Sequence, residues 1–117
     1  MKKCFPALGL ELMENNRYAL RYLSHFEEDL NKTVDYIAFK LHNKTAALEF
    51  VESVEKAISD RLNTPLSFEP YPSKRKRKHP YYRIYVKNYS IFYVVMDNVM
   101  EVRRLIYSKR NLKQQMD

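Results

Sequence analysis

Arginine and tyrosine alternate in the last third of this chain. Arg83 lies between Tyr81 and Tyr85, and Arg103 precedes Tyr107 by four residues. Successive side chains of an extended strand point to opposite faces, so Arg83 shares a face with both tyrosines and Arg103 shares one with Tyr107. Guanidinium groups bind phosphate oxygens, and aromatic rings stack on bases. The pattern predicts a surface that binds RNA or another acidic partner.

Further cations flank these strands. A run of five basic residues, Lys74 to Lys78, precedes His79, Lys87 ends the first of these strands, and Lys109 and Arg110 follow the last strand. Such a run is also typical of a solvated loop, and His79 is also typical of an exposed loop residue. We assign RNA binding to the following residues: Lys74, Arg75, Lys76, Arg77, Lys78, His79, Tyr81, Tyr85, Lys87 and Lys109.

Positive charge is concentrated in this part of the sequence. Residues 1–73 contain nine Lys and Arg against eleven Asp and Glu, whereas residues 74–113 contain twelve against two. A field of this sign attracts phosphate backbones and acidic protein surfaces. The basic segment from Lys74 to Lys113 is therefore predicted to be an antiparallel sheet segment that meets an acidic partner.

Several classes of chemistry lack their sequence signatures. The chain has a single glycine and no Walker A or dinucleotide fingerprint, which argues against a nucleotide cofactor. Cys4 is the only cysteine, so neither an internal disulfide nor a CxxC knuckle can form. His25 and His42 have no carboxylate or second histidine at ligand spacing. We expect no cofactor and no metal.

The N-terminal stretch differs from the rest of the chain. Met1 to Leu12 has two lysines and a short apolar patch, but the patch is too short for a signal peptide and contains Pro6. We expect residues 1–12 to be a disordered extension, with Met13 as an alternative start, and residues 13–117 to form one domain. The sequence contains no run of about 18 apolar residues, so no membrane span is predicted. A cytoplasmic setting is expected.

Hydrophobic periodicity predicts the first three elements. Residues 18–24 alternate as a short strand. Apolar residues then recur every three or four positions from Phe26 to His42, and again from Ala47 to Asn63, which predicts two amphipathic helices joined by a tight turn. Four prolines between Thr64 and Pro80 predict a long extended loop.

Three strands are predicted to follow. They span residues 81–87, 89–96 and 99–108, with Asp97-Asn98 as a hairpin turn, and residues 111–117 are predicted to be a tail. Strict alternation in the last strand would place Met100, Val102 and Ile106 on one side and Glu101, Arg103, Leu105 and Tyr107 on the other. Arg104 falls on the apolar side, which predicts a β-bulge there or a position at the sheet rim.

The most specific similarity lies in two segments. Tyr82 to Val95 contains a basic strand and a tyrosine-flanked strand, and Glu101 to Asn111 is a closing strand followed by Lys and Arg. With the predicted element order, this pattern resembles the RelE/ParE toxins of type II toxin–antitoxin systems from Arg17 to Asn111. The resemblance implies an α+β fold, β-α-α-β-β-β, with an N-terminal strand and an antiparallel helix hairpin packed on a twisted antiparallel sheet.

The family includes mRNA interferases, which are ribosome-dependent endoribonucleases that inhibit translation. In that branch the resemblance implies metal-independent attack of a ribose 2′-OH on the adjacent phosphate. It implies catalytic roles for Arg83 and Arg103 in neutralising the phosphorane, for Arg110 in clamping a second oxygen, and for Tyr107 in stacking or proton transfer. The chain departs from the family pattern at Ser90, where many relatives have Arg, and it lacks a clear Glu/His pair.

The resemblance leaves other functions and other residue roles open. The family also includes gyrase inhibitors of the ParE kind, and a shared fold does not separate the two activities. A non-catalytic relative that mainly binds its antitoxin is a third possibility. Arg83 and Arg103 could instead form salt bridges with Glu101, and Tyr107 could be an edge ring that covers the helix ends. In every case the resemblance implies a separate acidic antitoxin as partner.

Overall fold

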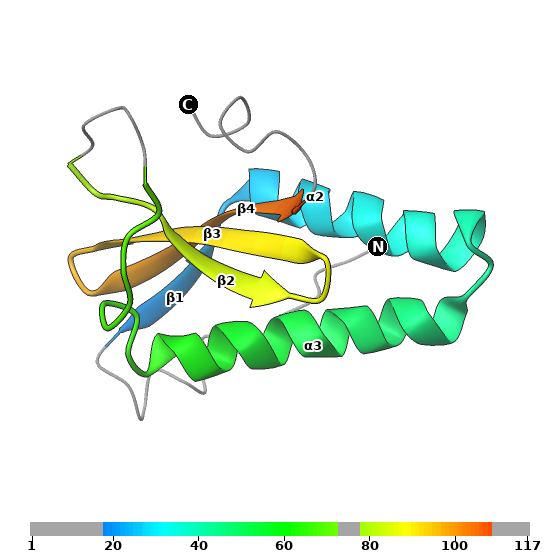
Figure 1. Ribbon diagram of the computed structural model, residues 1–117, viewed down its shortest axis with the longest axis horizontal. Coiled ribbons are helices and arrows are strands. Elements are labelled where there is room, and N and C mark those ends of the chain that lie inside the picture. The colour runs from blue at the N-terminus through cyan, green and yellow to red at the C-terminus, as the bar shows by residue number, and fades with distance from the viewer. Residues whose placement is uncertain (1–17, 73–77, 109–117) are drawn as a thin grey trace.

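The computed structural model describes residues 18–72 and 78–108 (Figure 1). Within these ranges the element order confirms the predicted α+β arrangement, one strand, two helical segments and three strands. The elements are β1 (Ala19–Tyr22), α2 (Ser24–Asp35) with its π-helical continuation η1 (Tyr36–Lys40), α3 (Lys44–Leu62), β2 (Tyr82–Val86), β3 (Tyr89–Met96) and β4 (Val99–Tyr107).

The four strands form one sheet in the order β1-β4-β3-β2. The meander β2, β3, β4 is antiparallel as predicted, but β1 pairs parallel to β4, so the expectation of a purely antiparallel sheet was wrong. The parallel pairing follows from the path between β1 and the meander. The two helices connect β1 to β2 at the opposite edge of the sheet, and the meander then places β4 beside β1 with both strands running in the same direction. A long crossover of this kind is what parallel pairing requires.

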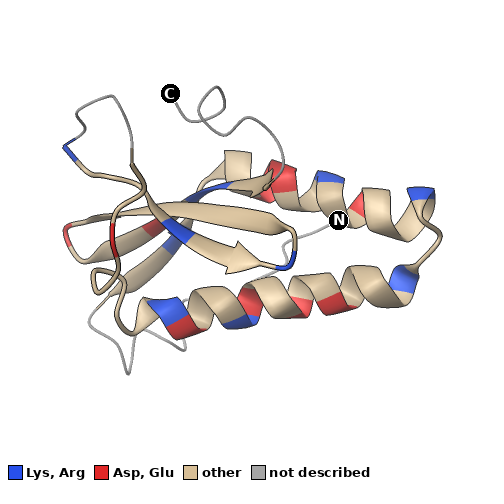
Figure 2. Ribbon diagram, viewed as in Figure 1, with Lys and Arg blue, Asp and Glu red and all other residues tan. Residues whose placement is uncertain are grey.

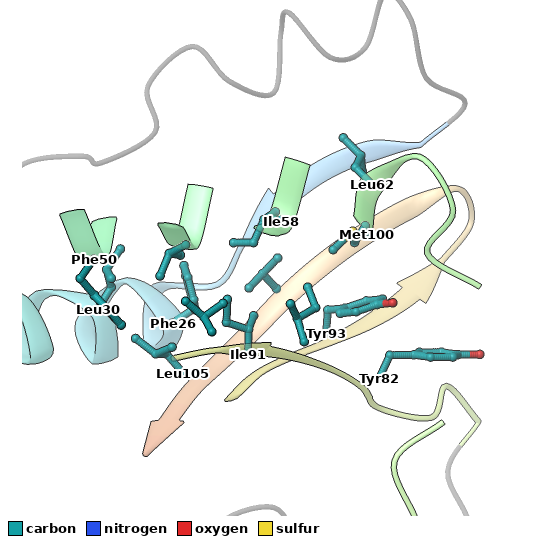
Figure 3. Close-up of a cluster of buried hydrophobic side chains, with 14 residues drawn as sticks. Phe26, Leu30, Phe50, Ile58, Leu62, Tyr82, Ile91, Tyr93, Met100 and Leu105 are labelled. Carbon is teal, nitrogen blue, oxygen red and sulfur yellow. The ribbon is translucent and has the colours of Figure 1, made fainter. Parts of the chain in front are cut away.

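The two helices run in opposite directions and pack on one face of the sheet (Figure 1). The apolar positions of α3 recur every three or four residues and form a continuous buried stripe. Figure 3 shows this stripe meeting side chains from α2 and from the strands. The side chains labelled there are Phe26, Leu30, Phe50, Ile58, Leu62, Tyr82, Ile91, Tyr93, Met100 and Leu105.

The first helical segment ends at Lys40, close to the predicted end at about His42, but its last part is π-helical. α2 ends at Asp35, and the chain continues through η1 to His42, whose φ of 50° lies in the left-handed region. The side chain of Asn43 then caps α3 by accepting a hydrogen bond from the backbone N–H of Ala46 at 2.9 Å. Polar residues at these positions therefore set where one helix ends and the next begins.

The strand turns agree with their sequence. Asp97 and Asn98 have φ of 48° and 65°, the two positive values that a type I′ hairpin turn needs. Lys87 in the β2–β3 turn also has a positive φ, 54°. In the long connection between α3 and β2, the described residues 64–72 and 78–80 contain neither helix nor strand, as predicted.

β4 contains the bulge that the sequence predicts. Phe92 pairs with Arg104 and Tyr93 with Val102, so Arg103 is the extra residue. Because one residue is inserted, the side chains exchange faces after it. Leu105 joins the core under the helices, and Ile106 packs with Phe92 on the opposite side. The predicted common face of Met100, Val102 and Ile106 was therefore wrong for Ile106.

A carboxylate on α2 completes the edge of β4 beyond the end of β1. The backbone N–H of Leu23 donates to the carbonyl of Val102 at 3.0 Å, and further along β4 the N–H of Leu105 donates to Asp29 Oδ2 at 3.0 Å. The same carboxylate forms an ion pair with Arg104 Nε at 2.9 Å. Asp29 thus neutralises the charge of Arg104 and also accepts the hydrogen bond of the Leu105 N–H, which the bulge leaves at the rim of the sheet.

None of the described helices is long and apolar enough to cross a membrane.

Candidate functional site on the outer face of the sheet

The sheet face opposite the helices, here called the outer face, carries Arg21, Arg83, Tyr85, Ser90, Phe92, Glu101 and Arg103. Its cations come from different strands, β1, β2 and β4, which the sheet topology brings onto one surface. Figure 2 shows basic positions both on the strands and on the helices, whereas the acidic positions lie mainly along α2 and α3. The charge asymmetry predicted from the sequence is therefore also an asymmetry between elements of the fold.

Arg83 lies on this face among aromatic rings. Its guanidinium carbon is 4.5 Å from the ring centroid of Tyr85, 5.6 Å from that of Tyr71 and 5.8 Å from that of Phe92. The Tyr85 ring is 70% exposed, so one side of this cluster faces solvent. Within the described ranges no carboxylate lies at ion-pair distance from Arg83. Its charge is thus free to attract an external anion.

Arg103 has a different environment. Its Nε donates to Glu101 Oε1 at 2.8 Å, and a hydrogen bond with Tyr81 adds to this contact. Arg21 binds the other oxygen of the same carboxylate, with Nε at 2.9 Å and Nη2 at 2.8 Å. The salt-bridge alternative is therefore correct for Arg103 and wrong for Arg83. Two guanidinium groups share one negative charge, so this cluster keeps a net positive charge of one.

Glu101 is the carboxylate that organises this cluster. Its side chain is only 6% exposed. Burial raises the pKa of Glu101, but the hydrogen bonds and charges of Arg103 and Arg21 lower it more, and the pKa ends below its ordinary value of 4.5.

This shift predicts a pH dependence of stability. A carboxyl group whose pKa is lower in the folded state than in the unfolded state binds fewer protons when folded, so its contribution is complete well above pH 4.5 and is lost as the pH falls through the folded pKa. We expect the parent to lose more stability between pH 6 and pH 3 than Glu101→Gln does. Urea unfolding across that range measures the difference, and parallel curves for the two proteins would contradict it.

Tyr107 does not lie on the outer face, so its predicted grouping with Arg103 was wrong. The bulge places it on the helix side, where its ring centroid is 5.3 Å from that of Tyr89, which in turn is 5.2 Å from Phe50. This is the position of an edge ring near the helices.

Tyr107 and Lys87 line a groove of about 740 Å³ on the helix side of the molecule. Their predicted roles in RNA contact therefore belong to a different surface from that of Arg83. The full lining consists of Asp29, Lys32, Thr33, Tyr36, Ile37, Leu41, Phe50, Lys87, Asn88, Tyr89, Leu105 and Tyr107.

The remaining predicted residues divide into two groups. Tyr81 lies on the outer face, with its ring centroid 6.2 Å from Phe92 and 5.9 Å from the guanidinium carbon of Arg103, while Lys78 is exposed and His79 half-buried. Lys74, Arg75, Lys76, Arg77, Lys109 and Arg110 lie outside the described residues. In the described part, no group of three or more His, Cys, Asp or Glu side chains could hold a metal ion.

The sequence assigned no contact to three residues that the structure brings to Arg83 and Glu101. Ser90 is fully buried and accepts a hydrogen bond from Arg83 Nε at 2.8 Å, and Ser108 lies 3.0 Å from Ser90 between the two Oγ atoms. Arg21 joins from the first strand. The available signal was strand periodicity, because Arg21 alternates with apolar Leu20 and Tyr22, but its distance in sequence hid its proximity to Glu101.

Comparison with known proteins identifies the family. The family model of the ParE toxin of type II toxin–antitoxin systems, parDE, matches residues 20–112. No curated protein matches the chain. In fold it is similar to the chromosomal ParDE toxin–antitoxin system from P. aeruginosa, with a TM-score of 0.66 and 14% identity over 80% of this chain and 98% of that one.

A second solved structure shows a weaker likeness. It is the E. coli DinJ–YafQ complex, with a TM-score of 0.43 and 19% identity over 77% of this chain and 92% of that one. The family match spans the two helices, the whole meander and nearly all of the first strand. The chain therefore belongs to the ParE toxin family and is a toxin of the type II toxin–antitoxin class.

Proposed function

We propose that this toxin inhibits translation by engaging mRNA through the outer face of its sheet, as a ribosome-dependent mRNA interferase. The observation that carries the proposal is Arg83, a guanidinium without a carboxylate partner in the described part of the chain and framed by three aromatic rings. A phosphodiester needs a positive group of this kind, and a base can stack on an exposed ring such as Tyr85.

The chemical roles follow from these positions. Arg83 would neutralise the charge that develops on the phosphorane when the ribose 2′-OH attacks. Arg103 would act at longer range, because Glu101 already holds its Nε. Tyr81 and Tyr85 would contact bases, and His79, which is half-buried and precedes Tyr81 by two residues, would be the candidate for proton transfer. Arg110 keeps its proposed role as a second phosphate clamp.

A second candidate function is inhibition of DNA gyrase by protein binding. It is favoured by the position of Tyr107, which lies on the helix side and so does not face Arg83 across one site. Without convergent proton-transfer groups, a toxin can still act by binding its target stoichiometrically. A purely antitoxin-binding relative would show no growth inhibition when expressed alone.

The proposed partner in the cell is a cognate acidic antitoxin. The P. aeruginosa structure that this chain resembles in fold is a ParDE toxin–antitoxin system, and here the outer face presents Arg21, Arg83 and Arg103 against a single described carboxylate, Glu101. An acidic segment that folds on binding would match this charge and would also cover the site proposed for RNA.

Pulse labelling after induction separates the two functions. If the toxin acts on mRNA, incorporation of labelled methionine should fall within minutes while incorporation of labelled thymidine continues at first. Purified toxin should leave gyrase supercoiling unchanged. Early loss of thymidine incorporation, together with inhibition of supercoiling by the purified protein, would instead support gyrase as the target. Co-expression with the cognate antitoxin is the control for specific toxicity.

A further inference from the structure

Two serine hydroxyls connect Arg83 to the end of β4. Arg83 Nε donates to Ser90 Oγ at 2.8 Å, and Ser90 Oγ lies 3.0 Å from Ser108 Oγ. Ser108 is itself fixed beside the β2–β3 turn, because its backbone N–H donates to the carbonyl of Asn88 at 2.8 Å. The three side chains come from β2, β3 and the residue after β4, so the sheet sets their spacing.

The burial of Ser90 determines which hydroxyl is the donor in the serine pair. Ser90 is 0% exposed, and its oxygen already accepts from Arg83, so its single hydrogen needs an acceptor. The oxygen of Ser108 is the acceptor that the described structure provides. An unmade hydrogen bond at a buried hydroxyl would be costly. Ser90 therefore donates to Ser108, which leaves the hydrogen of Ser108 available for another acceptor.

The serine partner preserves the charge of Arg83. A hydroxyl orients Nε without neutralising the guanidinium, whereas Glu101 both orients and neutralises Arg103. The Nη donors of Arg83 have no hydrogen-bond partner among the described residues. Two hydrogen bonds of 2.8 and 3.0 Å separate Arg83 Nε from Ser108 Oγ, a span over which both side chains can reach one phosphate group.

We propose that Ser90 is a positioning residue that holds the Arg83 guanidinium for a phosphodiester, and that the Ser108 hydroxyl donates a second hydrogen bond to the same phosphate group. The inference rests on the proposed RNA-directed function and names the contact that this function needs. The ligand class is a singly charged phosphodiester whose adjacent base stacks on Tyr85. Ser90 acts through Arg83 and does not touch the ligand.

A binding experiment with matched variants tests this inference. The probe is a dye-labelled single-stranded RNA of six uridines, and affinity is measured by fluorescence anisotropy. Ser90→Ala should weaken binding by about tenfold, because it removes the hydrogen bond that positions Arg83. Ser108→Ala should weaken binding by about threefold, because it removes a direct hydrogen bond to the phosphate. Ser108→Thr keeps the hydroxyl and should bind like the parent. Ser59→Ala, on α3, is the matched serine control and should leave binding unchanged.

Two further measurements separate positioning from a loss of folding. In ¹⁵N-arginine-labelled protein the Nε–H resonance of Arg83 should be protected from exchange in the parent and lose that protection in Ser90→Ala. In the Arg83→Ala background, Ser90→Ala should cause no additional loss of RNA affinity. An effect of equal size in both backgrounds would contradict a role through Arg83, as would parent-like affinity of Ser90→Ala.

The outcomes also separate this inference from the function on which it rests. If the parent binds the probe and Arg83→Ala loses it while Ser90→Ala does not, the positioning role is wrong and the RNA-directed function stands. If the parent fails to bind the probe, the inference is contradicted, whereas the ribosome-dependent function is tested separately by pulse labelling.

Discussion

Arg83→Ala is expected to abolish growth inhibition when the toxin is induced without an antitoxin. The substitution removes the one described cation of the outer face that has no carboxylate partner, and it removes the charged group at the centre of the ring cluster formed by Tyr71, Tyr85 and Phe92. Loss of a charge-assisted contact to phosphate should weaken RNA binding by roughly 30- to 100-fold. Colony counts and RNA anisotropy with purified protein measure the two effects.

Three control variants make this result interpretable. Lys56→Ala removes an exposed cation from α3, where Lys56 pairs with Asp60, and should leave toxicity intact. Arg83→Lys keeps the charge but loses the planar donor geometry, so it should restore part of the RNA affinity. Arg103→Ala should have a smaller effect than Arg83→Ala, because Glu101 already holds Arg103. If folded Arg83→Ala remained fully toxic, the assignment of Arg83 as the phosphate-binding residue would be wrong.

Asp29→Ala is expected to cause the largest loss of stability among changes outside the apolar core. The Asp29 and Arg104 side chains are 14% and 20% exposed, and removing the carboxylate leaves both Arg104 and the backbone N–H of Leu105 without their partner. Breaking a mostly buried ion pair that also satisfies a backbone donor should lower the free energy of unfolding by about 2–4 kcal/mol. In a domain of this size the melting temperature should fall by roughly 10 °C.

The matched control is Asp60→Ala, which removes a carboxylate from an exposed ion pair. Lys56 and Asp60 are 78% and 67% exposed, so that change should alter the free energy of unfolding by less than about 0.5 kcal/mol. Asp29→Asn keeps an oxygen that can accept from Leu105 and should fall between the two. Urea unfolding monitored by circular dichroism ranks the three variants, and equal stabilities for Asp29→Ala and Asp60→Ala would show that the bulge does not depend on this carboxylate.

The element order of this fold is predictable from sequence because its helices and strands have clear periodicities. The stripe on α3 and the Asp97-Asn98 turn each require a particular residue type at a particular place. The parallel partner of β1 is harder to predict, because strand direction depends on a crossover whose path is not encoded in local pattern. The π-helical segment η1 at the end of α2, which contacts α3, likewise has no signal in the hydrophobic periodicity of the sequence.

The site was only partly predictable for a related reason. Arg104 marks the bulge in the sequence, but alternation after the bulge reverses, and that reversal moves Tyr107 away from Arg103. The sequence marks Ser90 only as a departure from the family pattern, and a small polar residue in an apolar run does not reveal its hydrogen-bond partner. Its importance appears only when Arg83 is placed beside it on the neighbouring strand. Pairing between strands therefore decided which candidate residues meet.

Mapping the 5′ ends of cellular transcripts shortly after induction tests the central proposal most directly. If the outer face delivers mRNA to Arg83 for cleavage, new 5′ ends should appear at discrete positions within translated codons in cells that express the parent, and these ends should be absent with Arg83→Ala. Intact transcripts in cells whose growth has stopped would contradict the proposal.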